Sequence, residues 1–235
     1  MAWPLINQIF QILILSYVFS VIFKPKAPIP GRPETTLDFA IWLFAGTISW
    51  NATMQSLPAS AGSIFAQSNL VKKVVFPLHL LPLVPIFSNF VESLIGLSVA
   101  LAATLVIYGK LSLTVFALPF VMIPQLIFAS SLAYALSALT VFVRDIPQGL
   151  NLVIQIWFYL TPMIYPLSMV PEALRPFVLF LNPMAAIVES YRGLILRGEF
   201  PEAGPLLALY GVSFALLILS LGLFKRLRPG FADAL

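Results

Sequence analysis

The sequence predicts an all-α polytopic membrane protein, and its composition and hydropathy pattern carry that prediction. Hydrophobic residues make up 60% of the 235 positions and charged residues only 9%, whereas a soluble domain carries about 25% charged residues. The mean hydropathy is +0.99, so the polar surface is too small to cover a water-soluble globule. The apolar residues gather in long stretches, and a helix needs about 20 such residues to cross a bilayer.

Six apolar stretches are long enough to be considered as membrane spans. They cover residues 3–23, 39–57, 80–108, 113–143, 147–164 and 206–224. No room remains for a soluble catalytic domain, so we treat 1–235 as a single transmembrane domain. The first stretch lacks the basic start and the small-residue cleavage site of a signal peptide, and we expect it to be a retained helix.

Several functional classes are excluded by what the sequence lacks. There is no cysteine and only one histidine, His79, so neither a disulfide framework nor a thiolate metal site can form. A net charge of +4 is too small to indicate nucleic-acid binding. No phosphate-binding loop or hydrolase motif is present. We therefore expect this chain to hold no metal or cofactor of its own.

The distribution of lysine and arginine indicates the orientation only at one end. Basic residues are nearly balanced between the two sides of the predicted topology. The tightest basic cluster, Lys225-Arg226-Leu227-Arg228, follows the last span. Because basic residues favour the cytoplasm, we place the C-terminus on the cytoplasmic side.

The segment 62–76 is predicted to be a short amphipathic helix that ends at Pro77. One face carries Leu70, Val71, Val74 and Val75, and the opposite face carries Asn69, Lys72, Lys73 and Phe76. Such a helix lies on the membrane or on a partner rather than crossing. Its lysines either anchor the start of the third span or belong to a docking element for a cytoplasmic subunit.

A second unusual segment lies between the fifth and sixth spans. Asn182-Pro183 predicts a helix start, and Arg197-Gly198 predicts its end. The apolar residues of this helix fall on one side, namely Met184, Ile187, Val188, Tyr191, Leu194 and Ile195. An earlier short helix is predicted to open at Pro171, with Glu172 in its first turn. The pair forms an outer hairpin that either caps an exit or braces the spans.

Polar residues inside the spans have two interpretations. Glu92 is the only acid within a span and is expected to face the bundle interior or water. Stripes of serine, threonine and glycine in the second and fourth spans are better explained by close helix packing. At the end of the fourth span, Arg144 can reach headgroups and Asp145 is a candidate N-cap for the fifth helix.

Aromatic residues at the end of the fifth span suggest a route for a substrate. Trp157 and Tyr159 are two residues apart on a helix, so they cannot face the same side. Our hypothesis is that Tyr159 and Tyr165 line an exit, with Glu92 deeper along the path, while Trp157 anchors at lipid. The alternative is an ordinary interfacial belt of aromatic residues.

Four motifs together resemble the permease subunit of type 2 ABC exporters. They are Asn69-Leu-Val-Lys-Lys-Val-Val-Phe-Pro77, Phe142-Val-Arg-Asp-Ile146, Leu160-Thr-Pro-Met-Ile-Tyr165 and Asn182-Pro-Met184. The chain is most similar to the branch that exports lipid-linked O-antigen, teichoic acid and related polysaccharides. This resemblance covers about residues 3–228.

The resemblance implies a homodimer in the bacterial inner membrane, working with two copies of a separate ATPase subunit that binds ATP and Mg²⁺. Asn69, Lys72, Lys73 and Phe76 would couple to that ATPase. The hairpin 165–198, with Asn182, Pro183, Tyr191 and Arg192, would be a periplasmic gate. Family members usually begin with an interfacial helix, whereas here Met1-Ala2 leads directly into Trp3-Pro4, so contacts of that helix are not assigned.

Three other functions compete with polysaccharide export. A drug or small-lipid exporter would share the same architecture. A membrane-embedded glycosyl-lipid enzyme would need Glu92 and the loop acids as catalysts, but it lacks paired acids or a metal cluster. A purely structural subunit is weakly disfavoured by the polar face around Glu92.

Overall fold

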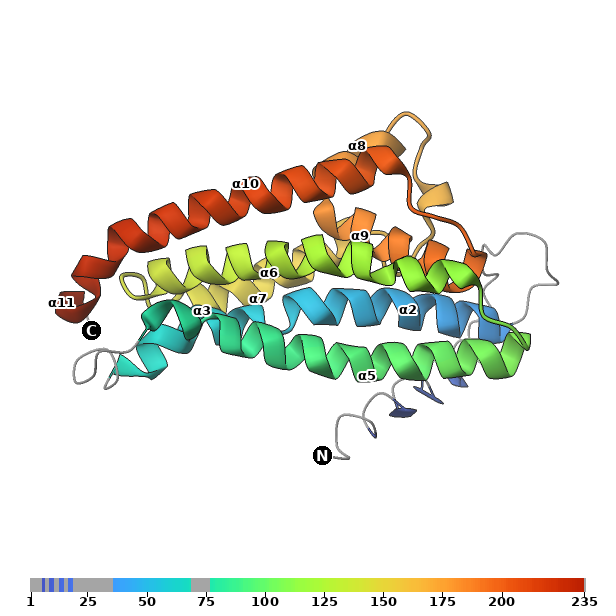
Figure 1. Ribbon diagram of the computed structural model, residues 1–235, viewed down its shortest axis with the longest axis horizontal. Helices are drawn as coiled ribbons and strands as arrows, with labels where there is room; N and C mark the ends of the chain where they lie inside the picture. The colour runs from blue at the N-terminus through green and yellow to red at the C-terminus, as the bar shows by residue number, and fades with distance from the viewer. Residues whose placement is uncertain are drawn as a thin grey trace. The chain divides into compact units, whose positions relative to one another are not determined.

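The computed structural model describes residues 36–68 and 77–234, together with positions 6, 9, 10, 13, 14, 17 and 18. Within these residues every regular element is a helix (Figure 1), which confirms the all-α prediction. Apart from the scattered positions, the first predicted span lies outside the described residues. The second half of the predicted amphipathic helix, 69–76, also lies outside them.

Long α-helices linked by short helical turns follow one another along the chain. The α-helices are α2 (Thr36–Met54), α3 (Leu57–Ala66), α5 (Leu83–Tyr108), α6 (Leu118–Thr140), α7 (Ile146–Leu160), α8 (Arg175–Leu181), α9 (Pro183–Arg192), α10 (Ala203–Leu227) and α11 (Phe231–Ala234). The 3₁₀ helices are η2 (Leu78–Leu80), η3 (Leu113–Ala117), η4 (Leu167–Met169) and η6 (Arg228–Gly230). The element η5 (Gly193–Arg197) is a π-helical turn.

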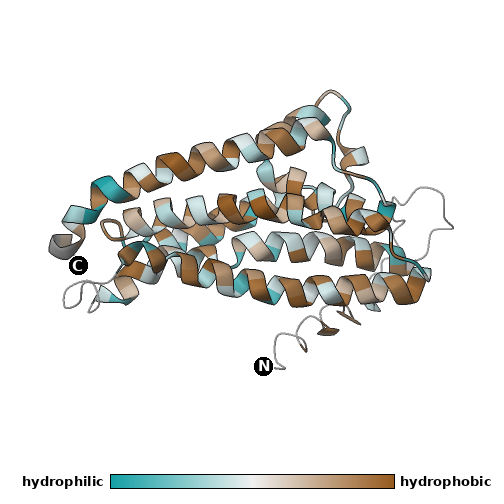
Figure 2. Ribbon diagram, in the orientation of Figure 1, coloured by the Kyte–Doolittle hydropathy of each residue, from teal (hydrophilic) through white to brown (hydrophobic). Residues whose placement is uncertain are grey.

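Three described helical stretches are long and apolar enough to cross a membrane. They are Leu78–Tyr108, Leu113–Thr140 and Ala203–Gly230, and they overlap the predicted third, fourth and sixth spans. Figure 2 colours α5, α6 and α10 mainly as hydrophobic. By contrast, α7 has 15 residues, fewer than the roughly 20 that a straight crossing requires. The total of six spans therefore stays a prediction.

The chain divides into two compact units. Unit 1 contains Met1–Trp50, Val91–Met122 and Thr161–Leu207, and unit 2 contains Asn51–Phe90, Ile123–Leu160 and Ala208–Leu235. Four helices, α2, α5, α6 and α10, contribute one part to each unit. Each unit has its own buried core.

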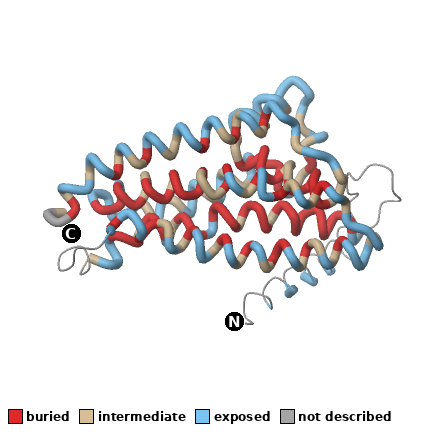
Figure 3. Tube along the Cα trace, viewed as in Figure 1, coloured by how far each residue is buried: buried red, intermediate tan, exposed pale blue. Residues whose placement is uncertain are grey.

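The core of unit 1 is built around the first turns of α2. Phe39, Trp42 and Leu43 form a buried cluster against which Leu196 packs. The Tyr108 hydroxyl at the end of α5 donates to the carboxylate of the buried Asp38 in α2. Figure 3 shows α2 and α9 as largely buried elements. Through Leu196, the turn η5 that directly follows α9 packs on this cluster.

The core of unit 2 joins α3, α6 and the end of α10. Its buried residues are Ile64, Leu78, Leu81, Tyr134, Ala138, Val141, Phe224 and Phe231. Polar side chains also bond between helices: Gln125 Nε2 donates to Thr53 Oγ1 at 3.0 Å. Asn89 Nδ2 likewise donates to the carbonyl of Asn51 at 2.6 Å. The polar stripe of the second predicted span is therefore a packing surface, as expected.

A glycine directly after α5 makes the turn between the third and fourth predicted spans. Helix α5 ends at Tyr108, and Gly109 has φ 68°, a left-handed conformation that glycine adopts without steric cost. The Gly109 amide donates to the Leu105 carbonyl at 2.8 Å, which satisfies one of the last helical carbonyls. Lys110 directly follows this glycine.

Candidate functional site

Helices α8 and α9 lie in the segment that was predicted to form an outer hairpin, and Asn182 lies between them. The Asn182 Oδ1 atom accepts from the amides of Met184 at 3.1 Å and Ala185 at 3.4 Å, while Pro183 occupies the first helical position. The Asn182 side chain also donates to Thr161 Oγ1 at 3.0 Å. The predicted N-cap is confirmed, and the same side chain ties the hairpin to the segment that follows α7.

The two ends of the hairpin agree with prediction only in part. At its C-terminal end Gly198 has φ 70°, which confirms the predicted glycine stop. At its N-terminal end the prediction was wrong, because α8 begins at Arg175 rather than at Pro171. The amides of Leu174 and Arg175 instead bond the Pro171 carbonyl. Glu172 lies in this preceding turn, with its carboxylate 3.6 Å from Arg175 Nη1.

The apolar face predicted for α9 is confirmed, and it includes a charged residue. Met184, Ile187, Val188, Tyr191, Leu194 and Ile195 are all buried. Arg192, four residues after Val188, lies on the same side and is 0% exposed. Charged side chains are rarely fully buried unless they are paired, so the partners of Arg192 matter for what the hairpin does.

Arg192 is bonded to two other parts of unit 1. Its Nε donates to the Trp42 carbonyl at 3.3 Å, and its Nη2 donates to the Met163 carbonyl at 2.8 Å. Its Nη1 donates to the Pro162 carbonyl at 2.5 Å and to Glu189 Oε1 at 3.0 Å. The guanidinium carbon also lies 3.4 Å from the ring centroid of Trp42. Arginine suits this role because its planar group donates in several fixed directions and stacks on aromatic rings.

Arg192 stays charged near neutral pH although it is buried. Burial lowers the pKa of Arg192 to about 10, and the neighbouring Glu189 carboxylate opposes that shift. Burial also raises the pKa of the adjacent Tyr191 hydroxyl. Arg192 is thus protonated and Tyr191 neutral, so α9 carries a paired buried cation rather than a titrating group.

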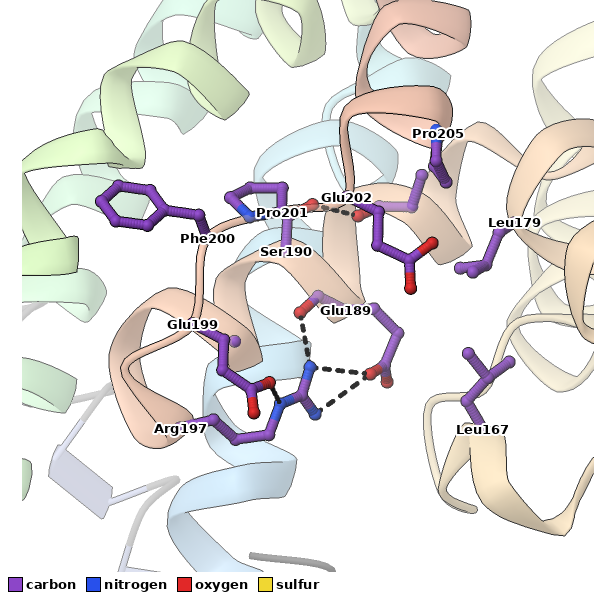
Figure 4. A pocket seen from close by; sticks show the side chains of 12 residues that line it. Leu167, Leu179, Glu189, Ser190, Arg197, Glu199, Phe200, Pro201, Glu202 and Pro205 are labelled. Carbon is purple, nitrogen blue, oxygen red and sulfur yellow. Dashed lines mark hydrogen bonds and ion pairs between the residues drawn. The ribbon is translucent and has the colours of Figure 1, made fainter. Parts of the chain in front are cut away.

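Glu189 connects Arg192 to a second arginine. Its Oε2 accepts from Arg197 Nη1 at 3.3 Å, and Arg197 Nε donates to Glu199 Oε2 at 2.9 Å. Figure 4 shows this chain of ion pairs at the edge of a cavity of about 130 Å³, with the Glu202 carboxylate pointing toward the space. A neighbouring cavity of about 360 Å³ shares Glu189, Arg197 and Glu199.

The charges around the smaller cavity favour one kind of ligand over another. Three carboxylates line it, those of Glu189, Glu199 and Glu202, together with the Arg197 guanidinium. Ionised carboxylates accept hydrogen bonds but cannot donate them. The cavity therefore suits neutral molecules that are rich in hydroxyl groups better than it suits anions.

A second polar surface lies on α7 in unit 2. Gln148, Asn151, Gln155 and Tyr159 are all exposed, and at 3.6 residues per turn they fall within an arc of about 80°. The opposite side packs inward, where Trp157 meets Phe128 edge-on with ring centroids 6.2 Å apart. We refer to the four exposed residues as the α7 polar stripe.

The structure separates Trp157 from Tyr159, as their helical spacing predicted. Tyr159 is 61% exposed, whereas Trp157 is half-buried. Lipid anchoring by Trp157 stays a prediction, and the structure adds a packing role against α6. The remaining path residues, Glu92 and Tyr165, are half-buried in unit 1. Their assignment to a path also stays a prediction.

The predicted ATPase-coupling residues fall outside the described part of the chain. These are Asn69, Lys72, Lys73 and Phe76. The described helix that leads toward them, α3, begins at Leu57 and ends at Ala66, so helical structure starts earlier than the predicted residue 62.

The predicted cytoplasmic boundary residues, Arg144 and Asp145, lie directly before α7. The Arg144 guanidinium carbon is 5.0 Å from the centre of the Phe65 ring in α3. Asp145 occupies the position before the first helical residue, and its carbonyl accepts from the Gly149 amide at 3.0 Å. Arg144 thus contacts another helix, which sequence reasoning did not anticipate.

Sequence comparison places these features among known proteins. The model of the family described as "ABC-2 type transporter" matches residues 1–196. The O-antigen export system permease protein RfbA of Myxococcus xanthus is 29% identical over 235 residues, which cover 99% of this chain and 86% of that protein. Two proteins of Klebsiella pneumoniae with the same description are each 27% identical, with the same coverage.

Proposed function

Because the chain belongs to the ABC-2 type transporter family, we propose that it forms the channel of an ATP-driven exporter for lipid-linked polysaccharide. Family membership makes the chain a multi-pass membrane subunit of a transporter rather than an enzyme. The substrate, the stoichiometry and the residues of the path are the parts that we propose.

The observation that carries the proposal is the α7 polar stripe. Exposed large side chains on α5 are apolar, as lipid contact requires; they include Val84, Phe87, Val91, Leu94, Leu105 and Val106. The α7 stripe instead exposes three carboxamides and a phenol. Polar side chains in membrane segments usually face a bundle interior or a water-filled cavity. We therefore assign the stripe to the wall of the translocation path.

The chemistry of the stripe suits a glycan. Carboxamides both donate and accept hydrogen bonds, and so do the hydroxyl groups of a sugar. From Gln148 to Tyr159 the stripe covers 11 helical steps, or about 16 Å, so a moving chain meets several similar contacts in turn. Many weak sites permit conduction, whereas one tight site would hold the substrate. Relatives described as O-antigen export permeases support this substrate class.

The proposal includes a complete assembly. Two copies of this chain, each with six spans, enclose the path in the bacterial inner membrane, with the C-terminus in the cytoplasm. Two copies of a separate ATPase bind ATP and Mg²⁺ and dock on Asn69, Lys72, Lys73 and Phe76. Glu92 and Tyr165 are further path residues in this proposal.

The hairpin 165–198 acts as the periplasmic gate in this assembly. Asn182 and Pro183 start α9, while Tyr191 and Arg192 fix that helix within unit 1. The cavity at Glu189 and Arg197 offers hydroxyl acceptors on the same element. A gate with these properties can release a neutral glycan without trapping it.

Single-cysteine labelling tests the path, and the chain offers a cysteine-free background. Gln148→Cys, Asn151→Cys, Gln155→Cys and Tyr159→Cys should react with a water-soluble thiol reagent in the assembled complex. Lipid-linked glycan should slow their labelling. The matched controls are Val153→Cys, Ile156→Cys and Leu160→Cys, which are exposed apolar positions on the same helix, and these should react slowly.

Two results would contradict the proposal. Equal labelling of the stripe and of the control positions would show that the stripe does not line a water-filled path. Protection by small amphiphiles but not by lipid-linked glycan would identify a drug or small-lipid exporter instead.

A further inference from the structure

Helix α3 packs against the start of α7 through small residues. Its sequence from Ala59 to Ser63 contains only alanine, serine and glycine, and small residues let helices approach closely. A Cβ atom at Gly62 would lie 4.0 Å from Cγ of Pro147 in the first turn of α7. This is an ordinary van der Waals distance, so a methyl group fits between Gly62 and Pro147, whereas a larger side chain at Gly62 would press on the first turn of α7.

A second contact, between Arg144 and Phe65, lies at the same interface. Arg144, two residues before α7, places its guanidinium 5.0 Å from the centre of the Phe65 ring. A cation at this distance from an aromatic face is attracted to it. Both Arg144 and Phe65 are exposed, so the core of unit 2 does not require this pair.

The opposite side of α3 is fixed to unit 2. Ile64 is 0% exposed and belongs to the core cluster that contains Val141 at the end of α6. The helix is thus anchored on one side by Ile64, while Gly62 faces α7 and Phe65 contacts Arg144 just before α7. A displacement of α3 would be passed to α7 because packed interfaces do not deform continuously.

The interface between α3 and α7 joins the helix that leads to the proposed ATPase-coupling residues and the helix that carries part of the proposed translocation path. Helix α3 ends at Ala66, three residues before Asn69, where the proposed ATPase-coupling residues begin. Helix α7 carries the polar stripe. We propose that Gly62 and Phe65 of α3, with Pro147 of α7 and Arg144 just before α7, form the contact that transmits ATPase motion to the translocation path. This inference rests on the proposed function, and these four are positioning residues that touch no substrate.

The test measures how accessible a position on α7 is to a thiol reagent, and it needs no substrate. The permease–ATPase complex carrying Gln155→Cys is reconstituted in lipid, and thiol labelling is timed with and without ATP. ATP should change the labelling rate. Gly62→Leu, which fills the contact with Pro147, and Arg144→Gln should each reduce that change by about fivefold or more, the smallest factor typical of coupling between sites.

Two controls separate coupling from simple structural damage. Gly222→Leu adds the same bulk in α10 where a Cβ meets nothing within 4 Å, and it should leave the ATP response unchanged. Arg144→Lys keeps the cation over Phe65 and should restore the response lost in Arg144→Gln. ATP hydrolysis and co-purification of the ATPase should persist in every variant.

The outcomes distinguish failure of this inference from failure of the proposed substrate assignment. A full ATP response in both Gly62→Leu and Arg144→Gln overturns the inference even when glycan is exported. Loss of hydrolysis in proportion to the labelling response also overturns it, since the contact would then be structural. Export of a small amphiphile in place of glycan would contradict the substrate proposal while leaving the transmission contact supported.

Discussion

The guanidinium of Arg192 lies 3.4 Å from the ring centroid of Trp42, and 150 positions separate the two residues in the sequence. Arg192 is 0% exposed and Trp42 only 2%. The same guanidinium bonds the carbonyls of Pro162 and Met163, just after α7. One side chain thus fixes α9 to α2 and to the segment that follows α7. Within the hairpin, α9 cannot swing away without breaking these bonds.

Replacing Arg192 should destabilise the protein more than any exposed arginine would. Arg192→Met leaves the carbonyls of Pro162 and Met163 without these donors and Glu189 with one arginine fewer, and breaking a buried charge pair costs about 3–5 kcal/mol. Thermal or denaturant unfolding in detergent measures the effect. Arg226→Met, at an exposed position, is the control and should change stability little. Equal stability of the two variants would contradict the anchoring role.

A glycine in α2 makes room for this arrangement. A Cβ atom at Gly46 would lie 2.6 Å from Nη2 of Arg192, so Gly46→Ala must displace the guanidinium and should cost about 1–3 kcal/mol. In Gly211→Ala the new methyl group meets nothing within 4 Å, and alanine is favoured over glycine in a helix by about 0.5–1 kcal/mol. Unfolding measurements should therefore show a lower stability for Gly46→Ala and a higher stability for Gly211→Ala. A stabilised Gly46→Ala would show that Arg192 relocates freely.

Local signals in the sequence predicted much of the hairpin. The cap at Asn182-Pro183 and the stop at Gly198 depend on neighbouring backbone groups, so they can be recognised without the fold. The buried face of α9 followed from its apolar spacing. The start of α8 was misplaced because Pro171 favours a turn as readily as a helix.

The partners of Arg192 could not be predicted in the same way. Arginine is normally exposed, and one of its partners, Trp42, comes from a helix far away in the sequence. One signal was available, because Arg192 follows Val188 by four residues on the buried face. The contact between Arg144 and Phe65 is also non-local. By contrast, helical geometry alone was enough to predict that Trp157 and Tyr159 face different sides of α7.

Two neighbouring aromatic residues of α7 should give different phenotypes. Trp157→Ala removes a half-buried ring that packs against Phe128, so it should lower stability, by less than the roughly 3–5 kcal/mol of a fully buried tryptophan. Tyr159→Ala alters an exposed ring and should slow export while stability and expression stay unchanged. Melting curves and export rates, measured on both variants, separate these effects. Normal export by Tyr159→Ala at a reduced melting temperature would reverse the assignment.

The proposed ATPase contact predicts a large effect on ATPase binding for one variant and a small effect for another. Phe76→Asp places a charge on an apolar docking residue and should abolish co-purification of the ATPase and export, with membrane insertion intact. Lys72→Ala should have a smaller effect, because an exposed ion pair contributes only about 0–1 kcal/mol. Affinity purification of the tagged chain measures ATPase recovery for each. Full recovery with Phe76→Asp would move the docking surface elsewhere.

Transport by the reconstituted complex tests the central claim most directly. The chain and its ATPase subunit are placed in lipid vesicles with lipid-linked glycan, and the glycan that reaches the opposite leaflet is measured with a membrane-impermeant glycan-binding probe. We predict ATP-dependent transfer that Gln155→Leu slows while ATP hydrolysis persists. Hydrolysis stimulated by small amphiphiles, with no glycan transferred under any condition, would contradict the account.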